Sequence, residues 1–292
     1  MGFSLGEWAN LYLDYCRQRL SDSRYKAKCL AFRCLFRTMR PVSPADALQK
    51  SDVLQHFSGM IEAGRTPNAA NEDLKNLRAA WNWAREMMTG FPQGDPFAIP
   101  PFPEDRRPRY VPPLADFWAV YACAETEQDE VLLLSFLCLA ARRGELFRLR
   151  VEDVDLERRQ VALGTRKRAG GSLQYDWVPM ADQLLPRMRE QIKRVPGPWV
   201  FPRPETGEPY FSRATWMRRL CNRAGVRRFG LHAIRHLTAS LLAESNVPTV
   251  QIQRVLRHQR ISTTDIYIRS LGCGAGAVAA IPLPPTRAEA KQ

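Results

Sequence analysis

Prolines crowd the segment 90–113, GFPQGDPFAIPPFPEDRRPRYVPP, and separate two dissimilar parts of the chain. Proline favours an extended backbone and cannot continue a helix, so we expect an interdomain linker here. A chain of 292 residues has the length of two ordinary domains. We therefore predict a first domain over residues 1–92, a linker over 93–113, a second domain over 114–271 and a flexible tail over 272–292.

The first part of the chain carries apolar residues at helical spacing and shows no strand pattern. Trp8 and Tyr12 lie one helical turn apart, which predicts a helix near the N-terminus. Ser43 is a suitable N-cap for another helix, because Pro44 then takes its first position. The further helices are predicted over 24–37, 44–62 and 68–88. We expect their aromatic residues to form a core.

The second part mixes strand and helix patterns. Alternation within 148–163 and over 175–180 predicts short strands, which the basic turn TRKRAGGSLQ joins into an antiparallel hairpin. Ser212 is expected to cap a helix that ends near Gly225. The predicted helices cover 114–125, 130–143, 181–193, 212–225, 232–244 and 249–258. The expected fold class is mainly α with a small antiparallel β-sheet: a helical N-terminal domain followed by an α+β domain.

The charge balance predicts a polyanionic partner. The formal net charge is +13 and the pI is about 9.8, which suits DNA, RNA or an anionic membrane surface. No apolar run reaches the roughly 18–20 residues that span a bilayer, and no secretory signal pattern is present. The seven cysteines are scattered without CxxC spacing, so we expect reduced thiols in a cytoplasmic protein and no zinc site.

Five residues of the second part suit a tyrosine that attacks a phosphodiester. They are Arg142, His232, Arg235, His258 and Tyr267. The phosphate gains charge on its non-bridging oxygens during attack, and guanidiniums stabilise that charge with paired hydrogen bonds. A tyrosine, with a pKa of roughly 10, needs nearby arginines and a histidine to become nucleophilic. A lysine on the basic hairpin suits protonation of the leaving oxygen, and Lys167 is the one lysine in TRKRAGG.

Three motifs in this order make the chain resemble the tyrosine recombinases, also called phage integrases. The first box of that family, roughly TGLRxGEL, is matched by LAARRGEL around Arg142. The second, HxLRHT, is matched by HAIRHL from His232, and the third, LGHxxxxTTxxY, by LRHQRISTTDIY, which ends at Tyr267. The helical first domain is similar in architecture to the family's core-binding domain, and the second domain would be the catalytic one.

The resemblance implies a role for each matching residue. Tyr267 attacks the scissile phosphate and forms a 3′-phosphotyrosyl link. Arg142 and Arg235 clamp the phosphate, and His258 donates a hydrogen bond to it. His232 handles a proton near the tyrosine.

The resemblance also implies supporting roles. Lys167 protonates the leaving 5′ oxygen. From its spacing, about one helical turn from Arg142, we expect Glu145 to orient that arginine, and we expect His236, next to Arg235, to support the site or pack rather than act as a catalyst. No metal ion, ATP or other cofactor is implied, because the covalent link stores the phosphodiester energy.

The expected partner is double-stranded DNA, held between two linked domains. Candidate DNA contacts are the basic residues of the hairpin, of the helix over 212–223 and of the third box, where arginine replaces the usual glycine: Arg166, Arg168, Arg213, Arg218 and Arg257. A solvated basic face is the alternative for the helix. The family implies a homotetramer on two recombination sites, a monomer when free, and a location at the bacterial nucleoid without membrane attachment.

Two other functions remain open at this point. A type IB topoisomerase shares the tyrosine chemistry but rejoins the same strand. A DNA-binding protein without catalytic activity would share the basic charge, although the complete set of five residues argues against it.

Overall fold

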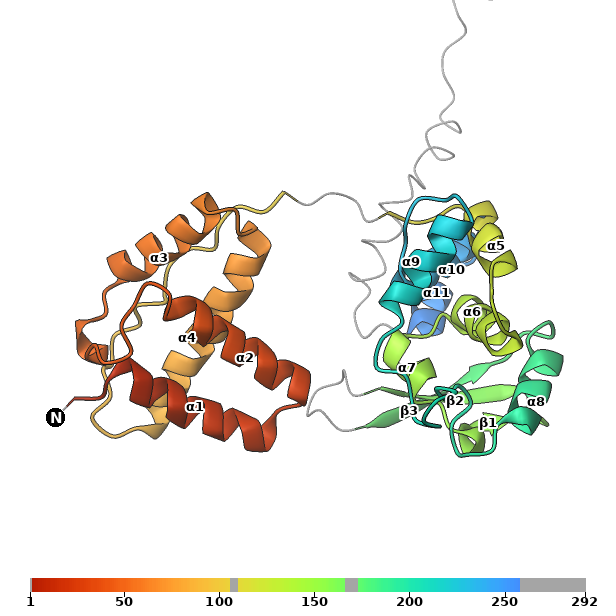
Figure 1. The fold of residues 1–292 in the computed structure, drawn as a ribbon, viewed down its shortest axis with the longest axis horizontal. Coiled ribbons are helices and arrows are strands. Elements are labelled where there is room, and N and C mark those ends of the chain that lie inside the picture. The colour runs from red at the N-terminus through yellow and green to blue at the C-terminus, as the bar shows by residue number, and fades with distance from the viewer. Residues whose placement is uncertain (1, 106–109, 166–172, 258–292) are drawn as a thin grey trace, which may run out of the picture. The chain divides into compact units, whose positions relative to one another are not determined.

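The computed structural model describes residues 2–105, 110–165 and 173–257 (Figure 1). The chain divides into two compact units, Met1–Arg107 and Pro108–Gln292, each with its own hydrophobic core. No helix among the described residues is long and apolar enough to cross a membrane. The cysteines of the described ranges are free thiols.

The first unit is helical (Figure 1). Its elements are α1 (Leu5–Arg19), α2 (Asp22–Leu35), the 3-10 turn η1 (Ala45–Ala47), α3 (Lys50–Glu62) and α4 (Pro67–Met87). Side-chain caps begin two of them: Ser4 and Glu7 form a capping box on α1, and Thr66 caps α4 with Pro67 at its first position.

Trp8 of α1 lies at the centre of the first core. Its ring meets those of Phe32 and Trp81 edge to face, with centroids 4.9 and 5.1 Å apart, and its indole N–H donates to the carbonyl of Ala80. Edge-to-face aromatic pairs and a satisfied indole make this a well-packed core. The aromatic residues of the first unit therefore form a core, as their spacing predicted.

The helix predicted over 44–62 with Ser43 as its N-cap is wrong in its first turns. Residues 41–45 pair with the beginning of the chain: the amide of Leu5 donates to the carbonyl of Ser43, and the amide of Ala45 donates to that of Phe3. This pairing holds Pro44 extended, and α3 begins only at Lys50, with Gln49 as its N-cap. A tertiary contact has overridden a favourable local start signal.

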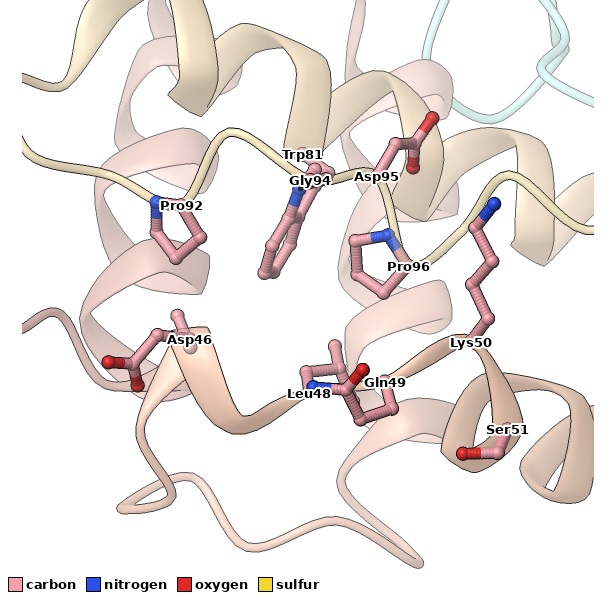
Figure 2. A pocket seen from close by; sticks show the side chains of 11 residues that line it. Asp46, Leu48, Gln49, Lys50, Ser51, Trp81, Pro92, Gly94, Asp95 and Pro96 are labelled. Carbon is pink, nitrogen blue, oxygen red and sulfur yellow. Dashed lines mark hydrogen bonds between the residues drawn. The ribbon is translucent and has the colours of Figure 1, made fainter.

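The first half of the predicted linker packs on the first unit. Phe97 is buried in its core, as is Phe91 just before the predicted linker, and the indole of Trp81 donates to the carbonyl of Gly94 at 2.6 Å. Figure 2 shows residues 92–96 facing residues 46–51 across a pocket of about 450 Å³, with the Trp81 ring between them. The proline-rich chain is thus a structural part of the first unit up to this point.

The second unit combines a three-stranded antiparallel sheet with helices. The sheet has the order β1 (Val154–Asp155), β2 (Gln160–Thr165), β3 (Gln174–Pro179). The helices are α5 (Leu114–Ala122), α6 (Glu127–Leu139), α7 (Arg143–Phe147), η2 (Val151–Asp153), α8 (Leu185–Arg194), α9 (Ala214–Arg223), α10 (Leu231–Glu244) and α11 (Thr249–Leu256) (Figure 1). The predicted fold class, mainly helical with a small antiparallel sheet, is confirmed.

Helix α6 is the central element of the second core. Residues 131–136 are all buried, so this helix is apolar on every side, as a helix surrounded by protein must be. It packs against α10, α8 and α7. Strand β2 contributes Val161 and Leu163 to the same core. The end of α6 is therefore fixed from several directions, which matters because the predicted Arg142 follows it.

Substitution of Phe97 tests whether residues 93–102 belong to the first core. We expect Phe97→Ala to lower the free energy of unfolding by about 3–5 kcal/mol, because it leaves a cavity in a packed aromatic cluster. Val42→Ala, at a side chain that is 81% exposed, is the control and should change it by less than about 0.5 kcal/mol. Urea titrations of the full chain measure both, and equal midpoints for the two variants would contradict the packing described.

Candidate active site

The end of α6 positions the first predicted arginine. The helix predicted over 130–143 ends four residues too late, because α6 (Glu127–Leu139) ends at Leu139 and Ala140 adopts a left-handed conformation with φ 45° and ψ 37°. Ala140 is buried against Ala239, Ile252 and Leu256, where a larger side chain would not fit easily. The chain then turns, and Arg142 becomes the N-cap residue of α7.

Arg142 and Glu145 bind each other around the first turn of α7. One carboxylate oxygen of Glu145 accepts from the backbone N–H of Arg142, and the other accepts from its guanidinium, both at 2.8 Å. The Glu145 side chain is 3% exposed and that of Arg142 is 20% exposed. The predicted pair is therefore in contact, and the carboxylate fixes both the backbone and the side chain of the arginine.

Arg257 completes this cluster from the end of α11. Its guanidinium donates to a Glu145 oxygen at 2.8 Å and to the carbonyl of Leu139 at 3.3 Å. Its own carbonyl accepts from the guanidinium of Arg142 at 3.2 Å. The Arg257 side chain is only 5% exposed and its guanidinium contacts Glu145 and the helix end, so this structure does not place it for the predicted DNA contact.

Arg235 of α10 joins the ends of α6 and α11. Its guanidinium donates to the carbonyls of Ala140 and Leu256, and the residue is 1% exposed. The last carbonyls of a helix lack partners within the helix and carry its negative dipole end. The ends of α6 and α11 therefore supply the acceptors that bring Arg142, Arg235 and Arg257 together.

The electrostatics of the cluster keep Glu145 ionised. Burial alone would raise its pKa, but the charge of Arg257 and the hydrogen bonds from Arg142 outweigh burial and lower the pKa below its usual value. Burial lowers the pKa of Arg257, and the neighbouring Glu145 opposes that shift. The Glu145 carboxylate is thus held by two guanidiniums, those of Arg142 and Arg257.

The two histidines of the second box occupy the first turns of α10. His232 is exposed and lies three residues before Arg235, so the two side chains leave the helix on the same side. His236 is buried, and its ring meets that of His232 edge to face with centroids 4.7 Å apart. This packing agrees with the supporting role expected of His236.

The remaining predicted catalytic residues lie outside the described part of the chain. These are Lys167, His258 and Tyr267, together with the hairpin arginines Arg166 and Arg168 and the predicted tail over 272–292. The structure brings together Arg142, Arg235 and Glu145, and it places His232 on the same helix as Arg235. Within the described ranges, no group of three or more His, Cys, Asp or Glu side chains could hold a metal ion.

Arg213 is not placed for a DNA contact. Its side chain is 11% exposed, it forms an ion pair with the buried Asp129, and its guanidinium lies 3.8 Å from the ring centroid of Trp216. It is the N-cap residue of α9, one residue after the predicted cap at Ser212. Arg218 of the same helix is exposed and remains available to a partner.

Sequence reasoning missed what Arg257 touches. The sequence held one indication: arginine replaces the usual glycine of the third box at position 257. The structure shows φ 51° and ψ 46° there, a conformation that favours glycine. A side chain as large as that of arginine at such a position suggests that it has a specific partner. Nothing local identifies that partner, because Glu145 is 112 residues away in the sequence.

The shared carboxylate makes a prediction about stability and pH. We expect Glu145→Gln to lower the free energy of unfolding at neutral pH by about 3–5 kcal/mol, because buried Arg257 loses its anion. The folded pKa of Glu145 lies below its usual 4.5, so its contribution is complete above that pH and is lost as the pH falls through the folded value. Urea titrations between about pH 3 and 7 should show the two proteins converging on acidification; a constant difference would contradict the assignment.

Arg213 is a largely buried cation and Arg218 is an exposed one, so we expect their removal to have different effects on stability. Arg213→Ala leaves Asp129 buried without its cation, so we expect a loss of about 3–5 kcal/mol of folding free energy. Arg218→Ala removes an equal charge from the surface of α9 and should cost less than about 0.5 kcal/mol. Thermal and urea unfolding of both variants check this; similar losses would show that Arg213 has no special structural part.

Comparisons with known proteins agree with the geometry. The chain is similar to the tyrosine recombinase XerC of Chromohalobacter salexigens, 28% identical over 233 residues that make up 71% of this chain and 72% of that one. It is also similar to the tyrosine recombinase XerA of Pyrococcus furiosus, 25% identical over 148 residues, about half of each chain.

The fold is that of solved integrases. A Tn1549 transposon integrase in complex with a circular intermediate DNA matches with a TM-score of 0.71 at 18% identity, over 89% of this chain and 94% of that one. A lambda integrase from a tetramer bound to a Holliday junction matches with a TM-score of 0.73 at 16% identity, over 93% and 79%. The model of the phage integrase family matches residues 118–272. The chain therefore belongs to the phage integrase family, whose members are enzymes that break and rejoin DNA strands.

Proposed function

We propose that this protein is a site-specific recombinase that cuts and rejoins DNA through Tyr267. The observation that carries the proposal is the convergence of both predicted phosphate-binding arginines on one peptide segment. Arg142 donates to the carbonyl of Arg257 and Arg235 to that of Leu256, and His258 is the next residue in the chain. Residues that are far apart in the sequence thus meet where the third box begins.

The proposed reaction needs no energy source beyond the DNA. The Tyr267 oxygen attacks the scissile phosphorus, and a 3′-phosphotyrosyl bond forms as the bond to the 5′ oxygen breaks. Lys167 donates a proton to that oxygen. His232 handles a proton near the tyrosine. A 5′ hydroxyl from a partner strand then attacks the phosphotyrosyl link, which restores a phosphodiester and frees the tyrosine.

Arg142, Arg235 and His258 are proposed to stabilise the charge on the non-bridging oxygens during each transfer. Loss of one such donor costs on the order of 3 kcal/mol of transition-state stabilisation in other enzymes. The hydrogen bonds of Glu145 suit this task, because Arg142 is already held in place before the phosphate arrives. Less reorganisation is then required during the reaction.

The proposed partner is double-stranded DNA, with the first unit acting as a core-binding domain and the second as the catalytic domain. The net charge of +13 and the DNA-bound state of the structurally similar integrases support this. Arg166, Arg168 and Arg218 remain the proposed DNA contacts, whereas Arg213 and Arg257 leave that set. The lambda integrase tetramer on a Holliday junction supports assembly as a tetramer on two sites. We place the protein in the cytoplasm, with the DNA.

A suicide substrate tests the proposal. The substrate is a duplex from the sequence flanking the gene, nicked beside the cleavage point. Cleavage releases a short fragment that carries the 5′ hydroxyl, and its loss by diffusion prevents rejoining and traps the covalent intermediate. We expect the wild type to give a covalent protein–DNA band on a denaturing gel and Tyr267→Phe to give none while it still binds DNA. Tyr175→Phe, at an exposed tyrosine of β3, is the matched control and should keep the band.

The outcomes separate the alternatives. A band that persists in Tyr267→Phe would show that another residue is the nucleophile. Tight binding without a band, on a substrate shown to contain the site, would favour a DNA-binding protein without catalytic activity. Relaxation of supercoiled DNA that has no specific site would favour a topoisomerase.

A further inference from the structure

Arg257 stands in a backbone conformation that favours glycine. Its φ of 51° and ψ of 46° lie in the left-handed region, where a Cβ atom is strained. The family's third box usually has glycine at this position. The arginine therefore carries a conformational cost that glycine would avoid, and its side chain must form contacts that compensate for it.

The contacts of the Arg257 side chain are buried and specific. Its guanidinium donates to Glu145, to the carbonyl of Leu139 and to that of Val255. A buried cation is stable only when it is paired and hydrogen-bonded, and Glu145 supplies the anion. The side chain is thus directed into the protein, toward the α6–α7 turn, rather than toward a ligand in solution.

The anion that binds Arg257 also binds Arg142. One oxygen of Glu145 accepts from the Arg257 guanidinium and from the Arg142 backbone N–H, and the other accepts from the Arg142 guanidinium. Two cations thus hold the one carboxylate. Without Arg257, Glu145 would keep Arg142 as its one guanidinium partner in this cluster, and its position would no longer be fixed from the side of α11.

We infer that Arg257 is a positioning residue for strand cleavage, which holds Arg142 in its phosphate-binding place through Glu145 and does not itself touch DNA. The inference rests on the proposed function, because it assigns Arg257 to the reaction of that site. Where the family pattern has glycine, this chain has a second cation on the Glu145 carboxylate.

Arg257→Gly tests the inference, because glycine relieves the left-handed backbone while it removes the guanidinium. We expect single-turnover formation of the covalent complex, at saturating protein, to slow by on the order of tenfold or more, as a displaced catalytic group causes. The DNA dissociation constant and its dependence on salt should stay as in the wild type. Arg254→Gln, an exposed arginine of the same helix, controls for the loss of one positive charge and should cleave at nearly the wild-type rate.

A pH profile separates positioning from general loss of structure. Loss of the Arg257 cation raises the pKa of Glu145, so the cleavage rate of Arg257→Gly should begin to fall at a higher pH on the acidic side than that of the wild type. Arg257→Lys keeps the cation and should keep the wild-type profile at a reduced rate. Circular dichroism at the assay temperature establishes that each variant is folded, and the lysine variant carries the test if the glycine variant is not.

Each outcome has a distinct meaning. Wild-type cleavage by Arg257→Gly, or an unshifted pH profile, would overturn the inference. A weaker dissociation constant with a log–log salt slope reduced by about one would overturn it in favour of a phosphate contact. A wild type that forms no covalent complex with its own site would count against the proposed function itself.

Discussion

The site depends on the hydrogen bonds and ion pairs that the Glu145 carboxylate forms with Arg142 and Arg257. The carboxylate is almost fully buried, and it accepts hydrogen bonds from the backbone and side chain of Arg142 and from the side chain of Arg257. Without it, two buried or half-buried cations would face each other at the beginning of α7. Its lowered pKa follows from this position and keeps the anion charged at neutral pH. The local charge is therefore positive but structurally stable, which suits a site for a phosphate.

Two helix ends provide the rest of the framework. Ala140 follows the end of α6 and Arg257 follows the end of α11, both in a left-handed conformation, and the carbonyls of Ala140 and Leu256 accept from the Arg235 guanidinium. Arg235 connects the two ends and is supported by the packing of α10 on α6. Carbonyl dipoles disperse positive charge without adding another acid. Carbonyls thus hold Arg235, Glu145 holds Arg142 and Arg257, and the Arg142 side chain stays partly exposed to solvent.

Much of this could be predicted from the sequence, because the informative signals are local. The HAIR motif lies in the first turns of α10, and the three-residue spacing of Arg142 and Glu145 lets the Glu145 carboxylate accept from the backbone N–H of Arg142 at the start of α7. The errors arise where a distant segment decides the outcome. Arg213 looked like a surface cation because its partner Asp129 is 84 residues away. The early end of α6 at Ala140 carries no glycine to mark it, and only the tertiary packing shows it.

The most direct test of the central claim is a double-mutant cycle between Glu145 and Arg257 in the free energy of unfolding. Unfolding by urea is measured for the wild type, Glu145→Gln, Arg257→Gln and the double variant. If the Glu145 carboxylate binds Arg257, the two single variants together should lose more free energy of unfolding than the double variant does. The difference, the coupling energy, should be about 1.5–3 kcal/mol. Losses that add within about 0.5 kcal/mol would show that the two side chains act independently and would contradict the account of the site.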